Sequence, residues 1–187
     1  MGIPQAVQLL VQLNRIDLID KKSLCSYIKQ LQHDESFIGD QWKEIDTCFS
    51  FCTVACLKLI DSLDIIDIDR ATNFIMICLN FDGDFGCIPG AKSHAGQIYC
   101  CLGFLSLVQR LDNLDLSTGN IEKLSKFILA AQDDETDGCA DRPGNISDPF
   151  HTLFWVVGLL LLNTYDENII RKVNSVLCMP EYIVQRT

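Results

Sequence analysis

The sequence predicts an all-α protein built from repeated helical hairpins, and two observations support this prediction. A nearly all-apolar stretch, a short Leu/Ile/Asp link and an amphipathic stretch follow one another four times, the fourth copy being incomplete. Equivalent residues also recur at a nearly constant interval, because Asp64 follows Asp17 by 47 positions and Asp115 follows Asp64 by 51. Periods of this size are typical of stacked helical repeats. The pattern fits either an open solenoid or a closed ring.

The two helices of each repeat differ in how much of their surface is apolar. The stretch Phe49–Ile60 is apolar on every side, which predicts an inner helix that is covered all round. The following stretch has apolar residues at helical spacing on one side only, which predicts an outer helix with one buried and one solvent-exposed face. These residues are Ile68, Ala71, Ile75 and Cys78.

The ends of the outer helices also carry recognisable sequence features. Asp20, Asp67 and Ser117 precede the outer helices and are expected to cap their N-termini. After each outer helix comes a link with glycine and an aromatic residue, which we expect to turn tightly and to plug back between the helices. In the third link Cys139 stands where an aromatic residue is expected.

Composition limits the classes of protein and partner. With 187 residues, 48% of them hydrophobic, the chain is expected to form a single domain over residues 1–187. Its net charge of −10 argues against nucleic-acid partners. The longest apolar run, Leu153–Leu162, is too short to span a membrane. The ten cysteines lie mostly in apolar helical runs, so a reduced, cytoplasmic protein is expected.

Two segments resemble the protein prenyltransferase β subunits, most of all those of Rab geranylgeranyltransferase (geranylgeranyl transferase type-2). The first runs from Asn80 to Gly90 and continues from Ser93 to Cys101. The second consists of Ala140–Gly144 and Asp148–Phe154. The resemblance covers nearly the whole chain.

This resemblance implies a fold, a reaction and partners. The fold would be an α/α toroid, a closed ring of hairpins around an apolar cavity, here with one internal repeat lacking. The reaction would transfer geranylgeranyl from geranylgeranyl diphosphate to C-terminal cysteines of Rab GTPases. The β subunit of the family works as a heterodimer with a prenyltransferase α subunit, and a Rab escort protein presents the substrate.

His151 matches the zinc-ligand histidine of this family, and the resemblance therefore implies Zn²⁺ as a cofactor. A catalytic zinc ion usually has three protein ligands. In the family the other two are the Asp and Cys of a D-x-C motif in the preceding hairpin, whereas the one D-x-C pattern between Gln97 and His151, at residues 137–139, lies in the link after the third outer helix. One hairpin, with these two ligands, is expected to be missing after Leu114. We therefore expect little or no zinc binding. Alternatively, His151 only begins a helix.

His94, Ala95 and Gly96 match the family's contact with the isoprenoid diphosphate. A histidine can donate a hydrogen bond to a phosphate oxygen, and glycine permits close approach. The alternative role for His94 is to cap the next inner helix. Basic residues of the family are replaced here by Ile88 and Cys48, whereas Arg142 is retained.

Three interpretations of the function remain open at this stage. The chain is a catalytic prenyltransferase β subunit, or a non-catalytic relative that binds the α subunit, the escort protein or the isoprenoid, or an incomplete product of a longer active subunit. A terpene cyclase is disfavoured because no D-x-D-D motif is present. The regular cysteines at 48, 52 and 56 are expected to pack in a helix rather than to bind a metal.

Overall fold

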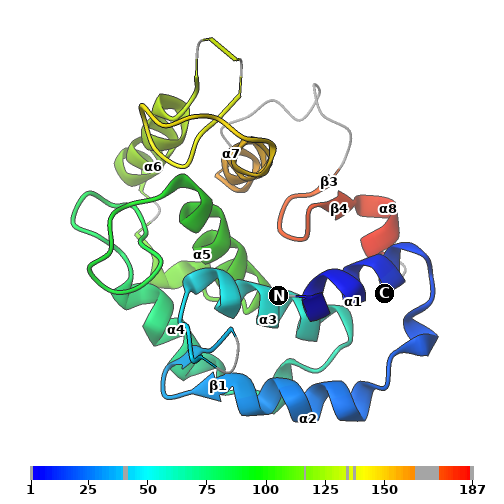
Figure 1. Ribbon diagram of the computed structural model, residues 1–187. Coiled ribbons are helices and arrows are strands. Elements are labelled where there is room, and N and C mark those ends of the chain that lie inside the picture. The colour runs from blue at the N-terminus through cyan, green and yellow to red at the C-terminus, as the bar shows by residue number, and fades with distance from the viewer. Residues whose placement is uncertain are drawn as a thin grey trace.

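The computed structural model describes residues 2–39, 42–115, 117–133, 135–136, 138–162 and 173–185, and helices dominate them. Figure 1 shows the helices arranged as two concentric layers of a ring. The inner helices are α1 (Gly2–Gln12), α3 (Thr47–Leu59), α5 (Ala95–Leu107) and α7 (Pro149–Leu161). The outer helices are α2 (Lys21–Leu31), α4 (Ile68–Ile77) and α6 (Thr118–Ala130). The predicted all-α toroid of hairpins is confirmed.

Short elements connect the helices. The Leu/Ile/Asp links form single 3₁₀ turns, namely η1 (Ile16–Leu18), η2 (Leu63–Ile65) and η3 (Leu111–Asn113). Two small antiparallel strand pairs complete the described part of the chain: β1 (Gln32–His33) with β2 (Ser36–Phe37), and β3 (Val173–Asn174) with β4 (Met179–Pro180). A short helix, α8 (Glu181–Val184), follows β4.

The inner helices pack side by side, α3 lying between α1 and α5, and α5 between α3 and α7. Every residue of α5 except Ser106 is buried, whereas α4 buries only one face, as the apolar patterns predict. At Gly103 a Cβ atom would lie 2.7 Å from the ring of Phe51, so glycine is what allows α3 and α5 to approach so closely.

The caps predicted for the outer helices are confirmed in two of three cases. The carboxylate of Asp20 accepts a hydrogen bond from the Ser23 amide, and that of Asp67 accepts one from the Arg70 amide. Ser117 lies at the N-cap position of α6, but its side chain makes no capping hydrogen bond. The backbone there adopts the capping conformation without side-chain help.

The links after the outer helices return to the ring and insert one side chain into it. Phe37 and Phe85 are fully buried, and Cys139, at the equivalent place in the third link, is 2% exposed. Each link is folded back by a short strand pair or β-bridge, such as that between Leu79 and Phe85. The predicted plugs are therefore present, with the smaller thiol in the third.

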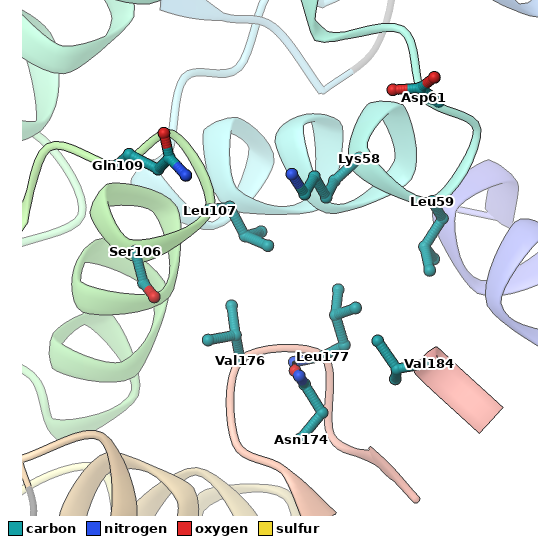
Figure 2. Close-up of a pocket in the computed structure, with 10 residues that line it drawn as sticks. All are labelled: Lys58, Leu59, Asp61, Ser106, Leu107, Gln109, Asn174, Val176, Leu177 and Val184. Atoms are coloured by element: carbon teal, nitrogen blue, oxygen red, sulfur yellow. Dashed lines mark hydrogen bonds between the residues drawn. The ribbon is translucent and has the colours of Figure 1, made fainter. Parts of the chain in front are cut away.

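The C-terminal segment lies between α7 and α1 in Figure 1. The Tyr99 hydroxyl of α5 donates a hydrogen bond of 2.6 Å to the carbonyl of Val176, and Leu177 and Met179 are buried in the core of the inner helices. A cavity of about 640 Å³ remains between this segment and the C-terminal ends of α3 and α5. Figure 2 shows Val176 pointing into it from the β3–β4 turn, and Leu107 from α5.

Large apolar side chains are exposed on the two terminal inner helices. On α1, Leu9 is 55% exposed, and on α7, Phe150 is 73% and Leu153 47% exposed. These flanks are the ones that further hairpins would cover in a larger ring. Within the described part of the chain, each helix is too short or too polar to span a bilayer.

Asp84 is expected to make stability depend on pH. Its side chain is 3% exposed, one carboxylate oxygen has no hydrogen-bond partner, and burial raises its pKa from 3.8 to about 7. The folded chain therefore holds a proton there that the unfolded chain releases, so stability falls as the pH rises from about 4 to about 7. Asp84→Asn should remove this fall and raise the unfolding free energy at pH 7.5 by about 1–3 kcal/mol.

Chemical denaturation at several pH values measures this effect. The matched control is Asp112→Asn, which changes an exposed aspartate and should leave the pH profile intact. An unchanged profile in Asp84→Asn would show that the carboxyl group is hydrated in solution.

The hydrogen bond from Tyr99 is expected to hold the β3–β4 turn in place. Tyr99→Phe keeps the ring but leaves the carbonyl of Val176 without its partner, which should cost about 1–2 kcal/mol. Hydrogen exchange measured by mass spectrometry should then show faster exchange in residues 173–180. Tyr27→Phe, at a tyrosine that is 44% exposed, is the control. Equal exchange in both variants would mean that apolar packing alone holds the turn.

Candidate functional site

Two histidines meet at the end of the ring where the inner helices begin. His94 is the N-cap residue of α5, and His151 lies in the first turn of α7. Since α5 and α7 are neighbours, the two rings come to a centroid distance of 5.1 Å, tilted by 51°. The structure thus brings together the residue matched to the diphosphate contact and the residue matched to the zinc ligand.

His94 caps α5, which was the alternative role for this residue. Its Nδ1 accepts a hydrogen bond of 3.0 Å from the Gly96 amide, so the ring proton lies on Nε2. Nε2 is 3.6 Å from a carboxylate oxygen of Asp141. Burial lowers the pKa of His94 and the Asp141 carboxylate opposes this shift, so a neutral ring that donates from Nε2 is favoured at neutral pH.

Ala95 and Gly96 support the His94 ring through the backbone. The Ala95 amide donates a hydrogen bond of 2.9 Å to the carbonyl of Asp141, which ties the start of α5 to the third link. A Cβ atom on Gly96 would lie 3.1 Å from the His94 ring, so glycine gives this ring its room. All three predicted residues therefore form one local structure.

His151 is held by the cap of its own helix. Asp148 accepts hydrogen bonds from the amides of Phe150 and His151 through one oxygen, and its other oxygen contacts His151 Nδ1. The hydrogen bond with the His151 ring is the largest of the effects that lower the pKa of Asp148. Nε2 is then the ring nitrogen left for a ligand, an arrangement that metal-binding histidines commonly show.

The residues around His151 do not fit a three-ligand zinc site. Its acidic neighbour Asp148 already holds Nδ1, and His94 is held by Asp141 and Gly96. No group of three or more His, Cys, Asp or Glu side chains that could hold one metal ion occurs among the described residues. Among the residues that the structure describes, which do not include Asp137, His151 therefore has no set of partners that would complete a metal centre.

Among the described residues, few cationic side chains lie near His94. Arg142 donates to the carbonyl of Ser93 at 3.0 Å and lies 3.5 Å from Asp141, so it has a structural role in holding the loops at this end of the ring. Ile88 is 42% exposed where the family has arginine. Lys92, on the loop before His94, is exposed. His94 remains the donor best placed at this end of the ring.

A line of aromatic rings leads from the histidines into the ring interior. The ring of His151 meets that of Phe154 at 6.2 Å, Phe154 stacks on Tyr99 at 5.2 Å, and Tyr99 meets Phe51 edge-on at 5.0 Å. Sequence reasoning assigned no role to these three aromatic residues. Their positions one helical turn or more inside α7, α5 and α3 could have marked them as lining the interior.

The sequence was compared with known proteins. The family model of the prenyltransferase alpha-alpha toroid domain matches residues 4–119 and 111–179. The geranylgeranyl transferase type-2 subunit beta of Saccharomyces cerevisiae is 32% identical over 231 positions, covering 97% of this chain and 70% of that protein. The subunit of the same name from Candida albicans is 38% identical over 141 residues. These residues make up 75% of this chain but only 41% of that protein.

A solved structure shows the same fold. The Candida albicans protein geranylgeranyltransferase-I complexed with GGPP superposes with a TM-score of 0.62, covering 94% of this chain and 70% of that one. With 16% sequence identity, this likeness concerns the fold alone.

The alignments agree with the predicted loss of one hairpin. The alignment with the yeast protein has 231 positions against 187 residues here, so at least 44 positions of the relative have no counterpart in this chain. The two family matches overlap at residues 111–119, which is where the hairpin was expected to be missing. By these similarities, the chain belongs to the prenyltransferase α/α-toroid family and is a relative of the geranylgeranyl transferase type-2 β subunits.

Proposed function

We propose that this chain is a binding member of the Rab geranylgeranyltransferase system. It holds geranylgeranyl diphosphate at His94, Ala95 and Gly96 and associates with a prenyltransferase α subunit, without transferring the lipid to a thiol by itself. The observation that carries the proposal is the contact between His94 and His151 at the outer end of a line of aromatic rings, while no group of three metal-ligating side chains occurs among the described residues.

The chemistry of prenyl transfer divides into two requirements. The isoprenoid must be bound, which takes an apolar interior and donors for the diphosphate. The acceptor sulfur must be a thiolate, and a zinc ion supplies it by lowering the pKa of the bound thiol. This chain keeps some of the residues that would bind the isoprenoid diphosphate. A group of side chains that could hold the zinc ion is absent from its described residues. Binding without turnover is what such a residue set supports.

Asp141 is expected to weaken diphosphate binding at this site. Its carboxylate lies 3.6 Å from His94 Nε2 and therefore takes the same donor that a phosphate oxygen needs. Burial raises the pKa of Asp141, but a hydrogen bond from Asn145 and the charge of Arg142 help to bring it below its usual value, so the carboxyl group is ionised at neutral pH and repels an anion. A bound diphosphate has to displace this contact.

The α-subunit proposal is supported by two features. The similar proteins are named as subunits, and a subunit implies a companion chain. The chain also exposes apolar side chains, among them Phe150 and Ile146, which is 89% exposed, near the start of α7. A Rab escort protein and Rab GTPases would be further partners of that assembly.

Diphosphate binding can be tested with a fluorescent geranylgeranyl diphosphate analogue. His94→Ala should weaken binding by about 10- to 100-fold, the range expected for loss of a hydrogen bond to a charged group. Asp141→Asn should instead strengthen it, because it frees Nε2 and removes a negative charge. The control is His33→Ala, at a histidine paired with Asp34 away from the ring interior. Unchanged binding in His94→Ala would refute the assignment.

Zinc content is tested on purified chain by elemental analysis. We expect well below one zinc ion per chain and no loss of stability on adding a chelator. One tightly held zinc per chain that is lost in His151→Ala would contradict the proposal. It would favour the alternative function, a catalytic β subunit, which the similarity to the yeast subunit supports. Transfer of geranylgeranyl to a Rab by this chain with an α subunit would do the same.

A further inference from the structure

The cavity at the C-terminal ends of α3 and α5 has no part in the proposed function. Its volume of about 640 Å³ lies within the range of small-molecule binding sites, about 300–1,000 Å³. None of the residues that line it in Figure 2 belongs to the histidine end or to the line of aromatic rings. The hydrogen bond from Tyr99 to Val176 lies between the two regions, because Tyr99 belongs to that line and Val176 to the wall of the cavity. The cavity is therefore a separate candidate site.

One part of the cavity wall is apolar. Leu59 of α3 and Leu107 of α5 form it on the side of the helices, and the C-terminal segment adds Val176, Leu177 and Val184. Figure 2 shows the leucines of the helices and the apolar side chains of the β3–β4 turn pointing toward one another across the cavity. A wall of this kind binds a hydrocarbon chain because it removes the chain from water.

The other part of the wall carries hydrogen-bond donors, namely the side chains of Lys58, Ser106, Gln109 and Asn174. In the described part of the chain, the Lys58 ammonium group has no ion pair or hydrogen bond, and neither has the side-chain amide of Gln109. The side-chain oxygen of Asn174 already accepts a hydrogen bond of 2.9 Å from the Leu177 amide, which leaves its NH₂ group as a donor. One cation and several neutral donors thus border the apolar wall.

The arrangement of charges favours an anionic group at this place. Figure 2 shows the Lys58 ammonium group and the Asp61 carboxylate on opposite sides, with the carboxylate beyond the end of α3. Carbonyl groups in the last turns of the two helices already accept hydrogen bonds from the turns that follow, as the 2.9 Å bond from the Ser62 amide to Leu57 shows. A carboxylate group can accept hydrogen bonds from the ammonium group and from the neutral donors together.

We propose that this cavity binds an aliphatic carboxylate, with its hydrocarbon chain against the Leu and Val side chains and its carboxylate group at Lys58. The neutral donors of Ser106, Gln109 and Asn174 orient the carboxylate oxygens. The net charge of −10 opposes the binding of any anion, so burial of the hydrocarbon chain supplies most of the affinity. The site lies at the other end of the ring from His94 and does not depend on the proposed function.

Calorimetry on the unmodified chain with decanoate, decan-1-ol and decylamine tests the choice of head group. The three compounds share one hydrocarbon chain, so their affinities differ only through the head group. We expect decanoate to bind about 2- to 5-fold more tightly than decan-1-ol, a modest factor because Lys58 is exposed, and decylamine to bind more weakly than both. Octanoate, shorter by two carbons, should bind about 15-fold more weakly than decanoate. Equal binding of decanoate and decan-1-ol, or tighter binding of decylamine, would overturn the proposal.

Variants locate the bound compound in the cavity. Lys58→Met keeps the hydrocarbon stem but removes the charge, and it should abolish the preference for decanoate over decan-1-ol. Lys126→Met, at a lysine on α6 whose side chain is 77% exposed, is the matched control and should keep that preference. Ser106→Phe should fill the cavity from α5 and abolish the binding of both compounds. Unchanged preference in Lys58→Met, or decanoate binding that persists in Ser106→Phe, would refute the assignment.

Competition on the unmodified chain separates this site from the diphosphate site. Decanoate should leave the binding of the fluorescent geranylgeranyl diphosphate analogue unchanged, and the analogue should leave the binding of decanoate unchanged. Displacement of one by the other would place decanoate among the aromatic rings and would contradict the proposal. Calorimetry with decanoate gives its result whether or not the diphosphate binds, so the two proposals can fail separately.

Discussion

Mutual burial of the inner helices is the constraint on which the rest of the structure depends. α3 and α5 are apolar on nearly every side, so neither is stable in water unless its flanks are covered. α3 and α5 cover each other, α1 covers the other flank of α3, and α7 covers the other flank of α5. Residues of the outer helices α2, α4 and α6 complete the core on the outer side. The close approach at Gly103 shows how tightly this contact is made. The hairpin repeat exists because it supplies one covered helix after another.

The same packing places the functional end of the molecule. An outer helix carries the chain back before each new inner helix, so neighbouring inner helices begin at the same end of the ring, as the contact between His94 and His151 shows for α5 and α7. Their first turns therefore gather at one end and their last turns at the other. His94 and His151 are far apart in sequence and meet only because each begins, or nearly begins, an inner helix. The cavity in Figure 2 lies at the opposite end.

The ends of the row of inner helices are covered unequally. Apolar side chains such as Phe150 and Leu9 are exposed there. The C-terminal turn covers part of the inner helices, because Leu177 and Met179 enter their core and Tyr99 holds the turn. A further hairpin, which the resemblance implies, would cover more of these flanks.

Much of the fold could be predicted from the sequence. This holds for the repeat period, the inner and outer helices, two of the three caps and the aromatic plugs. These features depend on local patterns, namely apolar spacing, a capping aspartate or a glycine next to an aromatic residue. Ser117 lies at its predicted N-cap position, but its side chain makes no capping hydrogen bond. Family motifs likewise marked His94 and His151. What the tertiary structure alone decided is which side chains face each other, namely the two histidines in contact and Asp141 and Asp148 as their partners. Such contacts join helices separated by about fifty residues, and no spacing along the chain determines the rotation of one helix against the next.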